Sequence, residues 1–142
     1  MATVPRLEDA AADARARAVF DDIRATRGTD HVNDFWRALA ADPALLEATW
    51  TRLKAVMAPG ALDPLVKEMV YLAVSVANGC AYCVHSHTAA ARAKGMTPTQ
   101  HGELMAVIAM AMQTNALATA TGVAPDAAFE AEDAAGERAP AK

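Results

Sequence analysis

Alanine is the feature that most constrains how this chain can fold. It supplies 37 of the 142 residues, while hydrophobic residues reach 54% and aromatic residues only 5%. Alanine is the best helix former and a poor strand former, so the composition predicts an all-α fold. The apolar content also excludes a disordered chain. The length fits one domain, which we expect over residues 1–130 with its core at about 42–122, followed by a mobile tail at 131–142.

The charge pattern excludes several classes of partner. Lysine and arginine number 13 against 17 acidic residues, and the formal net charge is −4. The basic residues are scattered, which argues against nucleic acid and anionic membranes as partners. A spanning helix needs about 20 apolar residues, whereas the run Met69–Ala77 is about half that long. The N-terminus has no apolar signal segment, and we therefore expect a cytoplasmic protein that does not bind membranes.

Helix start and stop signals divide the chain clearly. Asp42-Pro43, Asp63-Pro64 and Thr97-Pro98 each place a capping side chain before a proline, which is a typical helix start. Glycines or a Pro-Gly pair follow the expected segments and end them. The expected helices are 8–27, a short helix with Phe35, Trp36 and Leu39, then 43–57, 65–77, 80–94 and 98–121.

The sequence also predicts the environment of one helix and of several large side chains. The helix 65–77 is apolar on most sides, so we expect it to be buried. Glu68 is a charged residue within it, and a buried carboxylate is costly unless a partner requires it. The thin core expected of an alanine-rich chain with few aromatics predicts that apolar helices are covered by other subunits. Trp36 and Trp50 are expected to anchor packing, and Met105, Met110 and Met112 to lie in the core or in a subunit interface.

Two cysteines are too few for a disulfide scaffold, but they leave a redox or metal role open. Cys80 and Cys83 are three residues apart, which on a helix is about 60° of rotation, so the two thiols can meet. Both follow the Asn78-Gly79 break and lie in the first helical turn. Backbone N–H groups and the helix dipole there stabilise a thiolate. The pattern is typical of a reactive dithiol.

His87 and Glu68 complete a candidate site. His87 follows Cys83 by four residues, on the same helix face, and can accept its proton. A hairpin about Asn78-Gly79 would bring Glu68 within about one helical turn of His87, where a carboxylate would orient the imidazole and increase its basicity. Tyr82 lies between the cysteines, where a phenol can donate to a thiolate or a bound peroxide.

Two other interpretations of the cysteine pair remain open, a structural one and a zinc site. Cys80 and Cys83 can be two small buried residues. Zinc is another possibility, with Cys80, Cys83 and His87 as ligands and His85 or Glu68 as a fourth, although structural zinc usually recruits a second distant pair. His85 points away from His87 and is expected at the surface or in an interface.

The set Glu68, Cys80-Ala81-Tyr82-Cys83 and His87 resembles the signature of the AhpD-like alkylhydroperoxidases, in the carboxymuconolactone decarboxylase superfamily. The resemblance covers roughly 42–122. It implies an all-α fold that assembles into homo-oligomers, often trimers or hexamers, and thiol-dependent peroxidase or disulfide-reductase chemistry without a cofactor or metal. A hydroperoxide or a disulfide would be the substrate, and an external thiol the reductant.

The resemblance also implies roles for the residues. Glu68 and His87 would activate Cys83, and Cys80 would resolve the resulting sulfenic acid to a disulfide. Helix-terminus physics alone favours Cys80 as the more acidic thiol, but a base in contact outweighs a partial charge shared by the whole first turn, so we assign Cys83. The best-known family members have a histidine where this chain has Tyr82, which is a weaker base.

Two other functions compete with the peroxidase. Some members of the superfamily are lyases that decarboxylate a lactone acid without a cysteine pair, and the dithiol here argues against that activity. A non-enzymatic role is the other alternative, as a zinc-bound or structural oligomer that senses redox state.

Overall fold

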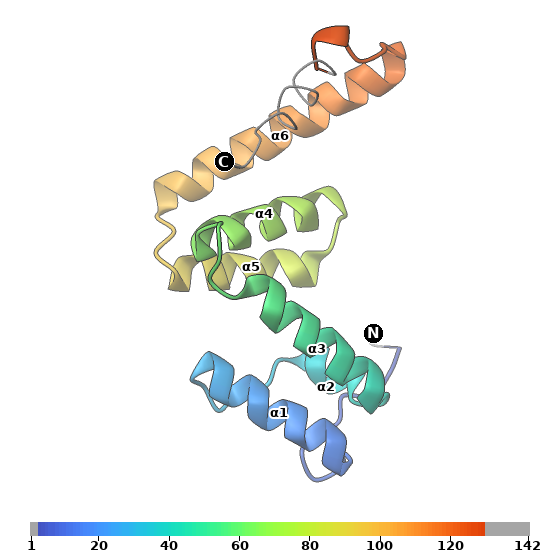
Figure 1. Cartoon of the computed structure of the whole chain (residues 1–142), viewed down its shortest axis with the longest axis vertical. Coiled ribbons are helices and arrows are strands. Elements are labelled where there is room, and N and C mark those ends of the chain that lie inside the picture. The colour runs from blue at the N-terminus through green and yellow to red at the C-terminus, as the bar shows by residue number, and fades with distance from the viewer. Residues whose placement is uncertain (1–2, 130–142) are drawn as a thin grey trace, which may run out of the picture. The chain divides into compact units, whose positions relative to one another are not determined.

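The computed structural model describes residues 3–129, and within that range it contains six labelled α-helices, a short helical segment at residues 127–129 and no strand (Figure 1). This confirms the predicted all-α fold. The expected tail at 131–142 lies outside the described residues. The helices are α1 (Ala14–Arg27), α2 (Asp34–Leu39), α3 (Pro43–Met57), α4 (Pro64–Ala77), α5 (Ala81–Ala93) and α6 (Pro98–Thr121).

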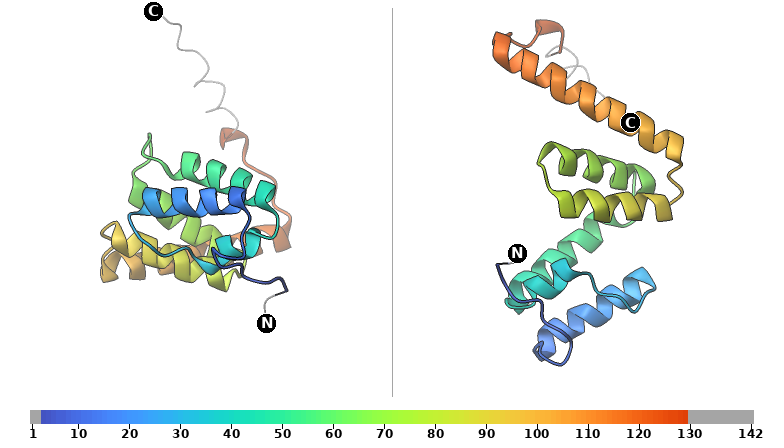
Figure 2. Two further views of the ribbon diagram at one scale, coloured as in Figure 1. Left: turned by 90° about the horizontal axis from the view of Figure 1, so that it is seen from below. Right: turned by 180° about the vertical axis from the view of Figure 1, so that it is seen from behind.

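The chain divides into two compact units at Pro64. The first unit, residues 1–64, packs α1 and α2 against α3 (Figure 2). Trp36 and Trp50 meet edge to face, with ring centroids 5.3 Å apart, and both are buried as predicted. The largest fully buried side chains of this unit are Phe20, Ile23, Val32 and Leu46.

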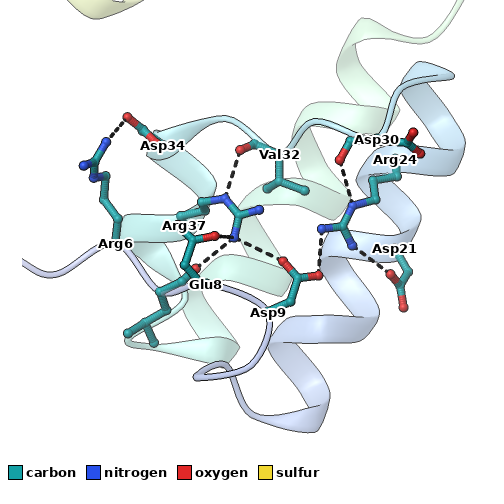
Figure 3. A network of polar contacts seen from close by, with 10 residues as sticks. Arg6, Glu8, Asp9, Asp21, Arg24, Asp30, Val32, Asp34 and Arg37 are labelled. Atoms are coloured by element: carbon teal, nitrogen blue, oxygen red, sulfur yellow. Dashed lines mark hydrogen bonds and ion pairs between the residues drawn. The ribbon is translucent and has the colours of Figure 1, made fainter.

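An arginine network fixes the segment that precedes α1 (Figure 3). Arg37 contacts Glu8 at 2.9 Å and Asp9 at 3.1 Å, and Arg24 contacts the other oxygen of Asp9 at 2.7 Å. The predicted start of the first helix at residue 8 is therefore wrong. Residues 8–12 form a turn, and the helix begins after Asp13, whose carboxylate accepts the Ala16 N–H at 2.8 Å.

The network gives the first unit a pH-dependent stability. The hydrogen bond from Arg24 to Asp9 holds the pKa of that carboxyl below its ordinary value. A depressed pKa stabilises the fold above the unfolded value, near 4, and this stabilisation is lost as the pH falls through the folded pKa. Asp9→Asn is expected to reduce the difference in unfolding free energy between pH 7 and pH 3 by about 0.5–1 kcal/mol, since the pair is partly exposed. Urea unfolding at both pH values measures it, and Glu103→Gln in α6 is the control; an equal loss in both variants would contradict the assignment.

The second unit begins with two antiparallel helices. Helices α4 and α5 lie side by side and are joined by a tight turn at Asn78 and Gly79 (Figures 1 and 2). Gly79 has φ 66°, a left-handed conformation that costs glycine little and other residues more. The hairpin expected about this turn is present.

The predicted burial of α4 is wrong for much of the helix. Its buried residues are Glu68, Leu72 and Ser75, whereas Val66, Val70 and Val74 are 41–54% exposed. These valines follow one another at four-residue intervals and form a continuous stripe along one side of the helix. The apolar composition of a helix indicates that its surface is buried by packing. It does not indicate whether that packing comes from the same chain or from another one.

Helix α6 has the predicted bounds. Thr97 and Gln100 form a reciprocal capping box at its start, with the Thr97 N–H donating to Gln100 at 2.8 Å, and the helix ends at Gly122. Ile108 is its one buried residue in the single chain. By length and composition alone, α6 is apolar enough to cross a bilayer, with a mean hydropathy of 1.3 in its most apolar window, of which 6% is buried.

A dithiol and a buried carboxylate on a helical hairpin

The cysteines lie where α5 begins. Cys80 is the N-cap residue and Cys83 is in the first turn, so the Cys-x-x-Cys motif starts a helix as predicted. The two residues form a disulfide, with their Cα atoms 5.3 Å apart. The Sγ atom of Cys80 also accepts the backbone N–H of Cys83 at 3.3 Å. The sulfur thus takes the place that a serine or aspartate oxygen takes at other helix starts.

Glu68 and His87 meet across the hairpin. The Nδ1 atom of His87 lies 2.7 Å from Oε2 of Glu68, which confirms the predicted proximity of the two side chains. The Glu68 side chain is 7% exposed and that of His87 16%. A carboxylate at Nδ1 favours the tautomer with its proton on that nitrogen, which leaves Nε2 as the nitrogen able to accept a proton.

Tyr71 fixes the plane of the imidazole. It lies one turn after Glu68 on α4, and its ring stacks on that of His87 with centroids 3.6 Å apart and planes 18° from parallel. A hydrogen bond at Nδ1 sets one direction of the imidazole, and the stacked ring limits its rotation about that direction. The imidazole is therefore held from two sides by α4.

Lys94 is the second partner of Glu68. Its Nζ atom lies 2.9 Å from Oε1 of Glu68, so each carboxylate oxygen has its own partner. Burial raises the pKa of Glu68, but the hydrogen bonds and charges of His87 and Lys94 outweigh that effect and leave the pKa below its ordinary value. Glu68 is therefore an anion at neutral pH, although it is buried.

The predicted pairs Glu68–His87 and Cys80–Cys83 are each in contact, and Tyr71 and Lys94 join the first pair. Tyr82 lies between the cysteines and is 44% exposed, and its predicted role stays a prediction. His85 is exposed, as expected. Sequence reasoning missed Tyr71 and Lys94. The signal for Lys94 was its position seven residues after His87, two turns later on the same helix face.

The described residues contain no group of three or more His, Cys, Asp or Glu side chains arranged to hold a metal ion. In this oxidised form the two cysteine sulfurs are bonded to each other, so they are not thiolate ligands. The arrangement instead provides a disulfide at a helix start and, one turn further along the same helix, an oriented imidazole on a buried carboxylate.

Fold and site together define an all-α protein with a Cys-x-x-Cys pair at the start of one helix of a hairpin. The chain belongs to the carboxymuconolactone decarboxylase family, whose model matches residues 43–126. It has the AhpD-like fold. The crystal structure of the alkylhydroperoxidase AhpD core from Rhodospirillum rubrum is 63% identical and superposes with a TM-score of 0.88, over 91% of this chain and 97% of that one. An uncharacterized protein from Cupriavidus necator is 34% identical over 82 residues, which is 58% of this chain and 73% of that protein.

Proposed function

We propose that this chain is a cofactor-free, thiol-dependent peroxidase or disulfide reductase that works through Cys80 and Cys83. The observation that carries the proposal is the Cys-x-x-Cys pair at the start of α5, followed one turn later by an imidazole that a buried carboxylate orients. The 63% identity to an alkylhydroperoxidase AhpD core supports it.

The proposed reaction has three steps. His87 accepts the thiol proton of Cys83, and the thiolate attacks the hydroperoxide, which breaks the O–O bond and leaves a sulfenic acid, while the protonated His87 returns its proton to the departing alkoxide to give the alcohol. The Cys80 thiol then attacks the sulfenic sulfur, which breaks the S–O bond, forms the disulfide and releases water that carries the Cys80 proton. Two electrons from an external thiol finally reduce the disulfide. In the resting site, Glu68 and Tyr71 hold the imidazole that moves the proton.

The first test uses the reduced protein and one equivalent of an alkyl hydroperoxide. Intact mass and free-thiol counts are followed over time, and the disulfide is mapped by peptide analysis. We expect rapid loss of both thiols together with a bond between Cys80 and Cys83. Thiols that stay inert, or that react only after unfolding, would overturn the proposal and leave the family relationship as a statement about fold.

A lyase is the second candidate, because the matching family model is that of the carboxymuconolactone decarboxylases. The two functions differ in their need for thiols. Decarboxylation of a lactone carboxylate that survives alkylation of both cysteines would favour the lyase. Loss of all activity on alkylation favours the peroxidase or reductase.

We also propose that the chain forms a homo-oligomer. From the sequence, Met110 and Met112 are expected in a core or an interface. They are 58% and 46% exposed, so they do not lie in the core of the chain, and we propose an interface for them. Val107 and Leu117 on α6 and the valine stripe on α4 are exposed as well. Apolar surface on this scale is typical of protein interfaces, and an interface helix has the same apolar composition as a spanning one. If α6 lies in an interface rather than a bilayer, the preparation should need no detergent. We propose a cytoplasmic location separately, and cell fractionation tests it.

Light scattering tests the oligomer. We expect a mass of three or six chains for the wild type, and a lower mass for the double variant Val107→Glu, Met110→Glu, because burying a carboxylate in an apolar interface is costly. Leu45→Glu, at a residue 51% exposed on α3, is the control. A monomeric wild type contradicts the oligomer, and an unchanged mass of the double variant contradicts the role of α6.

A further inference from the structure

We propose that Lys94 is a positioning residue for the dithiol site, whose ammonium keeps Glu68 ionised and aimed at His87 while the imidazole changes charge. The inference deepens the proposed function and rests on it. Its evidence is the contact of 2.9 Å between Lys94 and a carboxylate that is otherwise withdrawn from water.

Each oxygen of the Glu68 carboxylate has its own partner. His87 holds Oε2 at 2.7 Å and Lys94 holds Oε1 at 2.9 Å, while the Glu68 side chain is 7% exposed. A buried carboxylate that loses a charged partner takes up a proton more readily, because burial penalises its charged form. Both contacts therefore contribute to the anionic state of Glu68.

The two partners of Glu68 differ in whether their charge changes during the reaction. In the proposed reaction His87 is neutral before it takes the Cys83 proton and positive afterwards. The ammonium of Lys94 takes no part in that proton transfer, so its contact with Glu68 is the same before and after it. When His87 is neutral, Lys94 supplies the positive charge in contact with Glu68. Lys94 therefore keeps Glu68 ionised while His87 is still neutral and ready to accept the Cys83 proton.

The C-terminal cap of α5 fixes the backbone position of Lys94. It is the C-cap of α5, and its N–H donates to the carbonyl groups of Ala90 and Ala91, both at 3.1 Å. Gly95 follows with φ 94°, a conformation that favours glycine, and Met96 then donates its N–H back to Ala91 at 3.0 Å. This closed helix end holds the backbone of Lys94, so that a flexible side chain starts from a fixed point.

The groups that face the carboxylate define what a pH experiment will report. His87 and Lys94 reach it from α5. From α4, Tyr71 contacts His87 rather than Glu68 itself. Arg92 lies in the same last turn of α5 as Lys94 and is exposed. Replacing Arg92 thus removes the same charge from the same helix end without removing the contact to Glu68.

The experiment measures how fast iodoacetamide alkylates Cys83 as a function of pH, in reduced protein with Cys80→Ser so that one thiol reports. The inflection on the acid side of this rate profile is the pH below which alkylation of Cys83 slows. We expect Lys94→Met to move this inflection to higher pH by about one unit, because Glu68 then takes up a proton more readily. Lys94→Arg should restore the wild-type inflection, and Arg92→Met should leave it unchanged. Lys94→Gln, which keeps an N–H donor without charge, should shift the inflection like Lys94→Met and replaces it if that variant fails to fold.

A profile for Lys94→Met and Lys94→Gln that matches Arg92→Met would overturn the inference. Because alkylation uses no peroxide, the outcome is separate from that of the proposed function. A chain that fails to turn over peroxide can still show the Lys94 shift. A chain that reduces peroxide but shows no shift contradicts the role of Lys94 alone.

Discussion

Replacing Cys83 with serine is expected to slow the reaction of the remaining thiol with an alkyl hydroperoxide by about a hundredfold or more. The reason is that His87 lies one turn after Cys83 on α5, whereas Cys80 is the N-cap residue. General acid–base assistance by a positioned histidine contributes roughly 10²–10⁴-fold to a proton-transfer step. Stopped-flow loss of free thiol under excess hydroperoxide measures the rate.

Cys80→Ser is the matched variant, because it also leaves one thiol in the same motif. It should react with the first equivalent of hydroperoxide at nearly the wild-type rate and stop at a sulfenic acid, which a sulfenate-specific reagent traps. No intramolecular disulfide can follow, and turnover should cease.

The opposite pattern would have a clear structural origin. The backbone N–H of Cys83 donates to the sulfur of Cys80 at 3.3 Å, a contact that stabilises a thiolate on Cys80. If Cys83→Ser reacts fast and Cys80→Ser slowly, this hydrogen bond outweighs the histidine and the two cysteines exchange roles. Equal slow rates in both variants would instead contradict a peroxidatic thiol in this motif.

Local signals in the sequence predicted several helices with accurate bounds. Helix α6 begins at Pro98 because Thr97 and Gln100 satisfy the exposed N–H groups from within four residues. Helix α3 likewise begins at Pro43, where Asp42 accepts the N–H groups of Ala44 and Leu45. Such contacts depend on neighbouring residues and can therefore be inferred from sequence. The start of α1 was missed because residues 8–12 have the same alanine-rich and charged composition as the helix, and long-range contacts of Asp9 with Arg24 and Arg37 hold them outside it.

The candidate site was predictable where a turn fixes the register of two helices. The Asn78-Gly79 turn places Glu68 opposite His87, and both could be inferred from their spacing. Lys94 could not be assigned in this way, since it is 26 residues from Glu68 and its side chain must bend from a helix end toward the carboxylate. The exposure of Val66, Val70 and Val74 was also beyond the sequence, because it depends on which surfaces one chain can cover.

Glu68→Gln tests the carboxylate with little change in shape. Glutamine keeps one acceptor oxygen, so it can accept a hydrogen bond from either His87 or Lys94 while its NH2 group faces the other partner, and it brings no charge to the imidazole. We expect alkylation and peroxide reaction of Cys83 at neutral pH to fall by about ten- to a hundredfold, in the range of assistance that an oriented base provides. The unfolding free energy at pH 7 should fall by about 1–3 kcal/mol, because one of the two hydrogen-bond acceptors is lost and a partly buried ammonium loses its counter-ion.

The pH dependence separates this loss from a general weakening of the fold. The pKa of Glu68 lies below its ordinary value in the folded protein, so its contribution to stability is present above the unfolded value and is lost as the pH falls through the folded pKa. Glu68→Gln should therefore cost less stability at pH 3 than at pH 7. Glu47→Gln, at a carboxylate whose side chain is 47% exposed on α3, is the control and should leave both the thiol reactivity and its pH profile unchanged. A Glu68→Gln protein that keeps the wild-type rate and pH profile would show that the carboxylate supports the fold of the hairpin and takes no part in activating the thiol.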